Sequence, residues 1–314
     1  MKMLSFAIPC YGSEQTIKAV IDEIHSKMSE KREYDYEIIT VNDCSPDNVI
    51  SVLKEIAAKD RKLRIIDLSK NVGKHSALMA AYSVVNGDII INIDDDGQCP
   101  LDKLWELIAP LESGYDISIA RYSHKKQSGF KNFGSFVNAQ MAIHLVSKPK
   151  ELYLSNFSAV KRYVIDEMCN YRNPYPYIDG LFIRTTSKIT NVDMEERERS
   201  VGTGNFTLKK SLALWMNGFT AFSVKPLRMA DVAGIVSAVI GFIYAIITII
   251  RKLVNPDIAV GYSSIMAVML IIGGIIMVLL GLIGEYIGRI YICLNNSPQY
   301  VIREKINFDG NEEK

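Results

Sequence analysis

Two long apolar segments near the C-terminus most constrain how this chain can fold. Residues 229–250 and 263–283 carry almost no charge, and a helix of about 22 residues rises roughly 33 Å, enough to cross a hydrocarbon core of about 30 Å. The link between them, residues 251–262, is short and contains Asn255-Pro256. We therefore predict a transmembrane hairpin whose two ends lie on the same side of the membrane.

The charges beside this hairpin do not fix its orientation. Arg228 and Arg289 favour a cytoplasmic location for its two ends, whereas Arg251 and Lys252 in the link favour the opposite. Residues 1–228, however, have the composition of a charged soluble protein, and no secretory signal begins the chain. We therefore expect the N-terminal part, and with it both ends of the hairpin, to lie in the cytoplasm.

Composition excludes some classes of function. The 36 basic and 35 acidic residues nearly balance, so we expect no broad surface for nucleic acid. The five cysteines are odd in number and form no CxxC. This pattern predicts neither disulfides nor a zinc site, and it is typical of reduced cytosolic thiols.

Short apolar runs alternate with amphipathic stretches in residues 1–120. The predicted strands are 4–9, 36–41, 64–68, 88–93 and 116–120, and the predicted helices are 13–29, 48–59, 74–85 and 101–111. This alternation predicts an α/β domain with a mostly parallel, doubly wound sheet. Ligands of such sheets bind beyond the carboxyl ends of the strands. Tyr11, Glu14, Asp43 and the triplet 94–96 follow strands and are expected to converge there.

Three adjacent carboxylates, Asp94, Asp95 and Asp96, follow the apolar strand 88–93. Each negative charge raises the pKa of its neighbours, and a divalent cation relieves this repulsion. Mg²⁺ or Mn²⁺ suits oxygen ligands together with phosphate, and a nucleoside diphosphate would supply further oxygens. A solvated acidic turn is the alternative, but the position at the end of a buried strand favours a metal and nucleotide site.

Six segments form an ordered set of motifs. They are IPCYGSE at 8–14, NDCSPD at 42–47, NVGK at 71–74, DDDGQCP at 94–100, RSVGTGNF at 199–206 and FSVKPLR at 222–228. The set resembles the inverting family 2 glycosyltransferases of the GT-A fold. It is most similar to the polyprenyl-phosphate glycosyltransferases related to dolichyl-phosphate mannose synthase and to bacterial bactoprenol glucosyltransferases. The resemblance covers nearly the whole chain, including the hairpin.

The resemblance implies a pocket for a nucleotide-sugar. Its expected residues are Pro9, Tyr11, Glu14, Asp43, Lys74 and Asp94. Asp43 would accept a hydrogen bond from the base, and Lys74 would lie near the base or the diphosphate. The alternatives are that Glu14 is a charge in the first turn of a helix, where the dipole favours it, and that Lys74 is a solvated helix start.

The resemblance also implies catalytic and metal-binding residues. Asp96 and Gln98 would hold Mg²⁺ or Mn²⁺, which would neutralise charge on the leaving diphosphate, and Asp95 would be a spacer. Arg121 and Arg199 would meet phosphate charge and complete the catalytic set with Asp96. The alternative for Arg121 is an ion pair with a surface carboxylate.

Some positions depart from the family pattern. Gly12 replaces an Asn, Cys99 stands where an Asp is frequent, and Asn156 stands where some relatives have an Asp proposed as a general base. A hydroxyl acceptor needs such a base. A phosphate monoester has a second pKa of about 6 and is largely dianionic at neutral pH, so it can attack without a base when cations position it. Asn156 therefore favours a lipid phosphate as the acceptor.

We therefore predict an inverting enzyme of the inner membrane. It would transfer a sugar from a nucleotide-sugar, with UDP-hexose as the expected donor, to polyprenyl (undecaprenyl) phosphate at the cytoplasmic face. The product would be a lipid-linked sugar donor for envelope glycans. The alternatives are a processive polysaccharide synthase, which would need a Q-x-x-R-W element that the chain lacks, and a non-catalytic membrane module that keeps the fold.

The expected organisation has four parts: a catalytic domain at 1–205, a juxtamembrane amphipathic segment at 206–228, the hairpin at 229–290 and a cytoplasmic tail at 291–314. Within the second part, residues 208–222 form either an interfacial helix on the bilayer or an ordinary packed helix. Gly284 and Gly288 form a GxxxG, for which the alternatives are helix packing in the membrane and ordinary glycine use in a membrane helix. Together with the resemblance, this motif leads us to expect a homo-oligomer.

Overall fold

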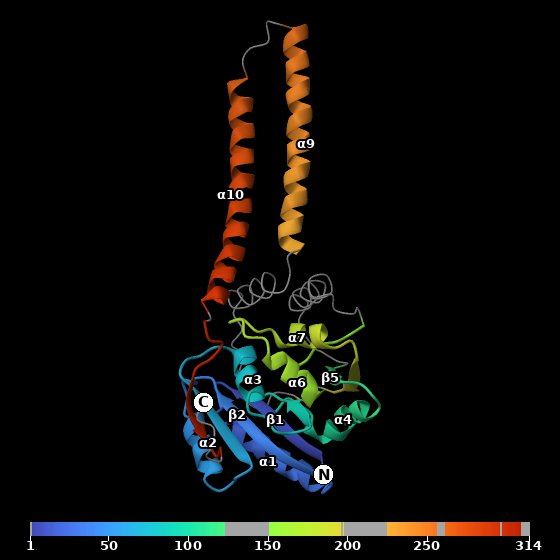
Figure 1. Ribbon diagram of the computed structural model, residues 1–314, viewed down its shortest axis with the longest axis vertical. Helices are drawn as coiled ribbons and strands as arrows, with labels where there is room; N and C mark the ends of the chain where they lie inside the picture. Colours follow the sequence, from blue (N-terminus) through green and yellow to red (C-terminus); the bar gives the residue numbers. More distant parts are fainter. Residues whose placement is uncertain are drawn as a thin grey trace. The chain divides into compact units, whose positions relative to one another are not determined.

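The computed structural model describes residues 2–122, 151–195, 197, 225–255, 261–295 and 297–308. The chain divides into two compact units, one formed by residues 1–211 together with 296–314 and the other by residues 212–295. The second unit is therefore an insertion, because the chain leaves the first unit and later returns to it. Figure 1 shows the elements of both units.

One sheet of eight strands organises the described part of the first unit, in the order β7-β5-β6-β4-β1-β2-β3-β8. The strands are β1 (Lys2–Cys10), β2 (Tyr34–Asn42), β3 (Leu63–Leu68), β4 (Ile89–Asn92), β5 (Ile117–Tyr122), β6 (Ser158–Lys161), β7 (Ile189–Met194) and β8 (Ile302–Ile306). Strands β3, β2, β1 and β4 run parallel, whereas β6 and β8 run antiparallel to their neighbours. The predicted α/β class with a mostly parallel sheet is confirmed.

Helices cover both faces of this sheet (Figure 1). On one side α1 (Ile17–Ser29) contacts α2 (Val49–Ala57) and the short 3₁₀ helix η1 (Leu101–Lys103), which leads into α4 (Leu104–Glu112). On the other side α3 (Lys74–Tyr82) contacts α6 (Arg162–Cys169), which contacts α7 (Ile178–Thr185). The helices α1 and α2 lie on the face opposite α3 because the chain moves outward from β1 to β3 and then crosses back to β4, and right-handed crossovers in opposite directions lie on opposite faces.

The apolar pattern of the sequence explains which faces are buried. Residues 4–10 of β1 and all of β4 are buried, as expected for central strands covered on both faces. The buried residues of α1, namely Ile17, Val20, Ile21, Ile24 and Met28, recur every three or four positions and form one stripe. Full burial of each such side chain contributes about 1.5–3 kcal/mol.

The C-terminal segment differs from the expected tail. Residues 302–306 form β8, which pairs antiparallel with β3 and completes one edge of the sheet. The β-branched ends of this strand, Ile302 and Ile306, are partly buried, whereas the three charged residues between them are exposed. The sequence analysis did not predict this strand, because it is short and charged at its three central positions. Short length and charged residues are both common in edge strands.

The described part of the second unit consists of two long helices, α9 (Lys225–Val254) and α10 (Tyr262–Leu294), which contact each other. Both extend beyond the predicted apolar segments. Large apolar side chains on them are exposed, among them Leu253, Met277 and Val278, each more than 70% exposed. By length and composition, one described stretch, 271–294, could cross a membrane, and 234–244 is a shorter apolar stretch. This apolar hairpin indicates association with a membrane.

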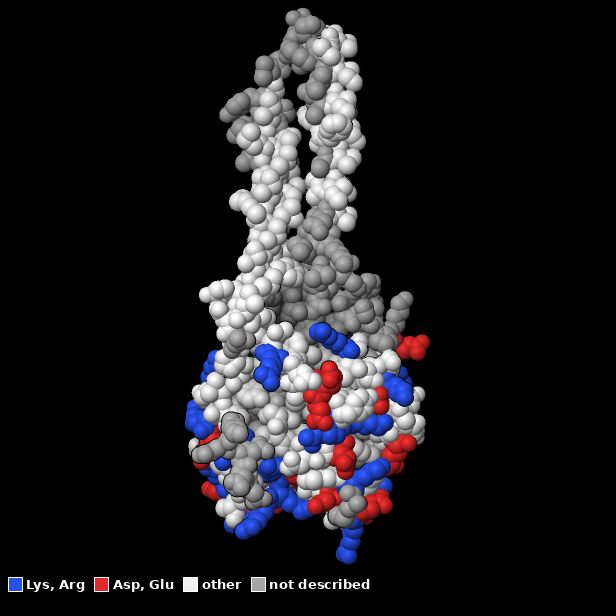
Figure 2. All heavy atoms as spheres, viewed as in Figure 1, with Lys and Arg blue, Asp and Glu red and all other residues white. Residues whose placement is uncertain are grey.

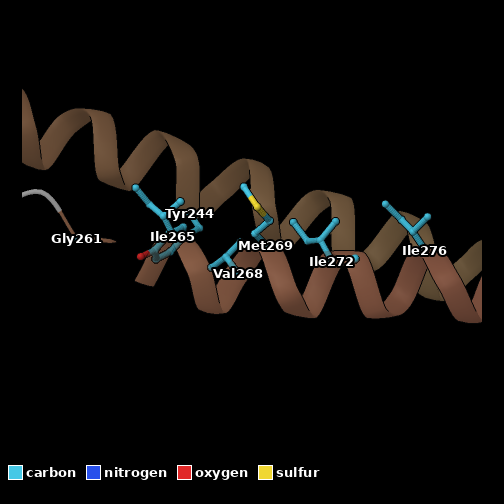
Figure 3. Close-up of a pocket in the computed structure, with 8 residues that line it drawn as sticks. Tyr244, Gly261, Ile265, Val268, Met269, Ile272 and Ile276 are labelled. Atoms are coloured by element: carbon cyan, nitrogen blue, oxygen red, sulfur yellow. The ribbon is translucent and has the colours of Figure 1, made fainter. Parts of the chain in front are cut away.

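A gap of about 520 Å³ separates part of the two helices and is lined by Tyr244 of α9 and, on the side of α10, by Gly261 and apolar side chains such as Ile265, Met269 and Ile272 (Figure 3). None of its lining residues is charged. Figure 2 shows acidic and basic side chains mixed over the visible face of the first unit, whereas the described atoms of the hairpin that this view shows are white. We therefore expect a site for polar ligands in the first unit.

Candidate active site

The candidate site lies where the strand order reverses. β1 is flanked by β2 on one side and by β4 on the other, and the helices that lead to these two neighbours cover opposite faces of the sheet. Open α/β sheets bind ligands in the crevice at such a switch point. Tyr11 directly follows β1, Asp43 directly follows β2 and Asp94 comes shortly after β4. Three of the predicted site residues thus meet at one edge of the sheet.

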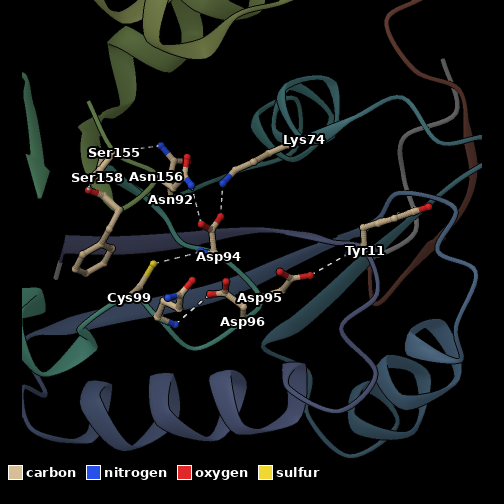
Figure 4. A network of polar contacts seen from close by, with 12 residues as sticks. Tyr11, Lys74, Asn92, Asp94, Asp95, Asp96, Cys99, Ser155, Asn156 and Ser158 are labelled. Atoms are coloured by element: carbon tan, nitrogen blue, oxygen red, sulfur yellow. Dashed lines mark hydrogen bonds and ion pairs between the residues drawn. The ribbon is translucent and has the colours of Figure 1, made fainter. Parts of the chain in front are cut away.

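Asp94 is held between two side chains from other parts of the chain (Figure 4). Its Oδ1 pairs with Nζ of Lys74, the first residue of α3, and its Oδ2 accepts a hydrogen bond of 2.8 Å from Nδ2 of Asn156. Asn156 is 62 residues away in the sequence. It reaches Asp94 because β6 runs antiparallel to β4 and pairs Ser158 with Asn92, which brings the start of β6 to the carboxyl end of β4.

A buried chain of polar groups fixes this register. Asn92 accepts a hydrogen bond of 2.8 Å from the hydroxyl of Tyr82 and donates one of 3.0 Å to Oγ of Ser158. All three side chains are buried, and a slip of either strand by one residue would leave them without partners. The position of Asn156 beside Asp94 is therefore determined by the core beneath it.

Asp95 accepts hydrogen bonds from the segment that follows β1. Its Oδ2 accepts the N–H of Tyr11 at 2.9 Å, and its carbonyl oxygen accepts the hydroxyl of Thr16 at 2.6 Å. Burial and, to a smaller extent, the charges of Asp94 and Asp96 raise its pKa to about 6, although the hydrogen bond from Tyr11 opposes the shift. Asp95 therefore joins the segment after β4 to the segment after β1, which is more than the predicted spacer.

Asp96 and Gln98 lie in one tight turn. Oδ1 of Asp96 accepts the N–H of Gln98 at 3.1 Å, and Nε2 of Gln98 donates to the carbonyl oxygen of Arg197 at 3.4 Å. Between them Gly97 has a φ of 75°, in the left-handed region that glycine tolerates. The described residues contain no group of three or more His, Cys, Asp or Glu side chains that could hold a metal on their own.

The donor chemistry of this turn nevertheless suits Mg²⁺ or Mn²⁺. Mg²⁺ usually binds through one or two protein oxygens and takes its other ligands from water and substrate phosphates. Asp96 and the carboxamide oxygen of Gln98 are the two side-chain oxygens that this turn offers for such a role. A bound diphosphate would have to complete the set.

The loops after β1 and β2 are joined to each other. Oγ of Ser45 accepts the N–H of Gly12 at 2.8 Å and donates to Oδ1 of Asp47 at 2.6 Å. Oδ2 of Asp47 accepts the N–H of Glu14 at 2.9 Å, and the carboxylate of Glu14 accepts the N–H of Asn48 at 3.2 Å. Glu14 thus contributes to loop structure, whereas Tyr11 is 54% exposed at the crevice. Pro9 is buried within β1, beside Val41 of β2.

Asp43 organises a third loop. Its two carboxylate oxygens accept the N–H groups of Val72 and Gly73 at 2.7 and 2.8 Å, and its carbonyl oxygen accepts Nδ2 of Asn71 at 3.1 Å. Burial raises the pKa of Asp43, against the effect of the two backbone donors. Gly73 has a φ of 84° and directly precedes α3. Asp43 therefore positions the loop that presents Lys74.

Arg121 forms an ion pair with a surface carboxylate, which was the alternative to the predicted contact with phosphate. Its guanidinium forms a two-point ion pair with Asp193 of β7, with Nε to Oδ1 at 2.5 Å and Nη2 to Oδ2 at 2.8 Å. Parallel pairing of β5 with β7 places these residues side by side. Tyr122 lines the crevice, and successive side chains of a strand point to opposite faces, so Arg121 points away from it. Arg199, the other predicted arginine, lies outside the described residues.

A small polar pocket opens beside Asp94. Its volume is about 190 Å³, and it is lined by Asp94, Gln98, Cys99, Tyr122, Tyr153, Leu154, Ser155 and Asn156. Cys99 is buried, and its Sγ accepts the N–H of Asp94 at 3.5 Å. All five cysteines are free. The sequence did not indicate Tyr122, which pairs with Met194 of β7, or Tyr153, whose backbone is held by the side chain of Asn191 in β7.

The fold is an α/β sheet with a polar crevice at its switch point, and comparison with known proteins specifies the family. Residues 5–168 match the family model of glycosyl transferase family 2, and residues 225–290 match that of the GtrB C-terminal hairpin. The chain belongs to glycosyl transferase family 2 and carries a GtrB-type hairpin. The predicted family and its glycosyltransferase activity are therefore confirmed.

Individual relatives extend over nearly the whole chain. The chain is 33% identical to YkcC of Bacillus subtilis, described as an uncharacterized glycosyltransferase, over 98% of this chain and 95% of that protein. It is 31% identical to the undecaprenyl-phosphate 4-deoxy-4-formamido-L-arabinose transferase of Proteus mirabilis, over 96% of this chain and 94% of that protein. Among solved structures, glucosyl-3-phosphoglycerate synthase from Mycobacterium tuberculosis is similar with a TM-score of 0.48 and 20% identity, over 69% of this chain and 77% of that chain.

Proposed function

We propose that this protein transfers a hexose from UDP-hexose to undecaprenyl phosphate and inverts the anomeric carbon. The observation that carries the proposal is the set of Lys74, Asp94 and Asn156 in the crevice, with Asp96 two residues further along the chain. It combines a cation and a carboxylate for a nucleoside diphosphate sugar with a neutral amide where a general base would stand. The relative from Proteus mirabilis, named as an undecaprenyl-phosphate transferase, supports the same acceptor.

The chemistry of Asn156 favours a phosphate acceptor. Its Nδ2 donates to Asp94, and a carboxamide does not accept a proton at neutral pH. A hydroxyl nucleophile would need a base within hydrogen-bond reach. A dianionic phosphate monoester needs positioning and positive charge instead. In the reaction an oxygen of the lipid phosphate would bond to the anomeric carbon, and the bond from that carbon to the diphosphate would break.

Two features of the crevice supply positive charge. Lys74 lies at the N-terminal end of α3, where the positive end of the helix dipole adds to its charge. Asp96 and Gln98 would hold Mg²⁺ or Mn²⁺, which when bound would neutralise charge on the leaving diphosphate. Asp94 would contact the nucleotide-sugar while it keeps Lys74 and Asn156 in place.

The hairpin gives the reaction its location. Undecaprenyl phosphate lies in the bilayer with its phosphate at the surface, and α9 and α10 would cross the membrane as a pair. Because the chain enters and leaves the hairpin from the same unit, a double crossing keeps that unit on one side. We place it on the cytoplasmic side, where nucleotide-sugars are found, with the lipid-linked sugar as a donor for envelope glycans.

The test is a transfer assay with purified full-length protein. The protein is incubated with undecaprenyl phosphate, Mg²⁺ or Mn²⁺ and single nucleotide-sugars, and the lipid product is identified by mass. We expect a glycosyl undecaprenyl phosphate from a UDP-hexose. Asp96→Ala should abolish transfer and retain the circular dichroism of the wild type, whereas Asp22→Asn, which changes an exposed carboxylate paired with Lys18 on α1, should retain transfer. Full transfer by Asp96→Ala, or no product from any donor, would contradict the proposal.

A further inference from the structure

The segment after the hairpin reaches the loops that form the nucleotide pocket. The chain returns to the first unit at residue 296, and β8 then lies along β3. The C-terminal end of β3 leads into the loop of residues 69–73 that binds Asp43. Residues 299–303 therefore lie next to the start of a loop that contributes to the candidate site.

Ser69, the first residue of this loop, is held from both sides by the returning segment. Its N–H donates to the carbonyl oxygen of Val301 at 2.9 Å. Its carbonyl oxygen accepts a hydrogen bond of 3.1 Å from Nη2 of Arg303. The same loop, four residues further on, presents Gly73 to Asp43 and begins α3 with Lys74. The orientation of Ser69 thus sets the path of the chain toward Lys74.

A second line of contacts runs from Arg303 through the core to the other loops. Nη1 of Arg303 pairs with Oδ2 of Asp67 at 3.1 Å, and Oδ1 of Asp67 accepts Nδ2 of Asn42 at 2.7 Å. Oδ1 of Asn42 in turn accepts the N–H of Ser45 at 3.1 Å. Ser45 is the residue that joins the loops after β1 and β2 through Gly12 and Asp47.

Burial makes this line of contacts sensitive to Arg303. The side chain of Asp67 is only 5% exposed, whereas that of Arg303 is 55% exposed. A buried carboxylate is costly without a cationic partner. Without the guanidinium, Asp67 would keep the amide of Asn42 as its side-chain partner within the described residues. The change of lowest free-energy cost is then a rearrangement of Asn42 and Ser45 around the uncompensated carboxylate.

We propose that Arg303 is a positioning residue for the nucleotide pocket, acting through Asp67 and Ser69. The inference rests on the proposed function, because it assumes that the loops after β1, β2 and β3 hold a nucleoside diphosphate. It assigns a role to the strand that follows the membrane hairpin: this strand keeps three pocket loops in their binding conformation. Arg303 itself does not touch the substrate.

The first test measures nucleotide binding by full-length protein without lipid. UDP, GDP and dTDP are titrated by calorimetry in the presence of Mg²⁺, and the tightest is compared between variants. We expect Arg303→Gln to weaken binding by about three- to tenfold, in line with the loss of a hydrogen-bonded charge partner. Arg303→Lys, which keeps a cation beside Asp67, should recover most of the affinity.

The matched control is Glu304→Gln on the same strand. Glu304 pairs with Lys54 at 2.7 Å, and both side chains are nearly half exposed, so this change removes an ion pair of β8 without touching Asp67 or Ser69. We expect wild-type nucleotide binding. In transfer assays Arg303→Gln should raise the KM for the donor while kcat and the KM for the lipid stay within twofold of the wild type.

A double-mutant cycle with Asp67→Asn tests the route through Asp67. Asp67→Asn removes the buried charge and keeps an acceptor for Asn42, so Arg303→Gln should cost less affinity in an Asp67→Asn background than in the wild type, where only the contact with Ser69 is still lost. Additive losses, or full nucleotide binding by Arg303→Gln, would overturn the inference alone. A wild-type protein that binds none of the nucleotides would overturn the proposed function and the inference together.

Discussion

Replacing His75 by glutamine should flatten the pH dependence of the stability of the first unit below pH 6.5. Nδ1 of His75 accepts the N–H of Ile178 at 3.4 Å, at the start of α7, and its ring packs edge-on against Tyr177 with centroids 5.3 Å apart. Burial and then the adjacent charge of Lys74 lower the pKa of His75 to about 4. The fold therefore holds the neutral ring, which is the form that can accept this hydrogen bond.

The sign and size of the effect follow from linkage. The unfolded chain takes up a proton near the ordinary pKa of about 6.5, whereas the folded protein resists it until about pH 4. The contribution of His75 is thus fully present above pH 6.5 and is lost as the pH falls toward 4. For a single site with these two pKa values, the free energy of unfolding drops by about 2 kcal/mol between pH 7 and pH 5.

Urea unfolding of the full-length protein in detergent, followed by the fluorescence of Trp105 on α4, measures this quantity at the two pH values. His75→Gln is the suitable comparison because its carboxamide oxygen can still accept the N–H of Ile178. Carboxylates titrate alike in both proteins, so the difference between their two losses isolates His75. If both proteins lost the same free energy between pH 7 and pH 5, the argument for a neutral His75 in the folded protein would be refuted.

Two further substitutions test the site and the sheet. Asn156→Asp should lower the rate of sugar transfer at pH 7, because it replaces a donor to Asp94 by a second carboxylate; a rate above wild type in initial-rate assays would show that the acceptor needs a base. Gly87→Ala should destabilise the protein by about 1–3 kcal/mol, since its Cβ would lie 2.6 Å from Oγ and 2.7 Å from the backbone N of Ser5. A urea midpoint equal to that of the wild type would contradict that close approach, and Ser5→Ala alone serves as its control.

Much of the sheet could be predicted from local pattern. The largely apolar runs at 36–41, 64–68 and 88–93 became β2, β3 and β4 because a strand covered on both faces carries a near-continuous apolar run. The placement of Tyr11, Asp43 and Asp94 at one edge followed from a general property of parallel sheets. The strands β6, β7 and β8 were not predicted, because each is short and mixes polar with apolar residues.

The partners within the site could not be predicted in the same way. Asp94 was expected to contact a nucleoside and Arg121 to meet phosphate, but the side chains that hold them, Asn156 and Asp193, come from strands whose pairing the local pattern does not specify. Asp95 was expected to be a spacer, and its bond to the N–H of Tyr11 depends on the adjacency of β1 and β4.

The sequence by itself determined the family, the parallel core and the apolar hairpin, because ordered motifs and the length and period of apolar runs are local properties of a chain. Only the tertiary structure decided that Lys74 and Asn156 share Asp94, that Arg121 points away from the crevice, and that the residues after the hairpin form β8 with Arg303 on Asp67. The physical reason is that a strand binds its neighbours through backbone groups, which every residue carries. The choice of neighbour, and with it the partner of each charged side chain, therefore depends on how the whole sheet assembles.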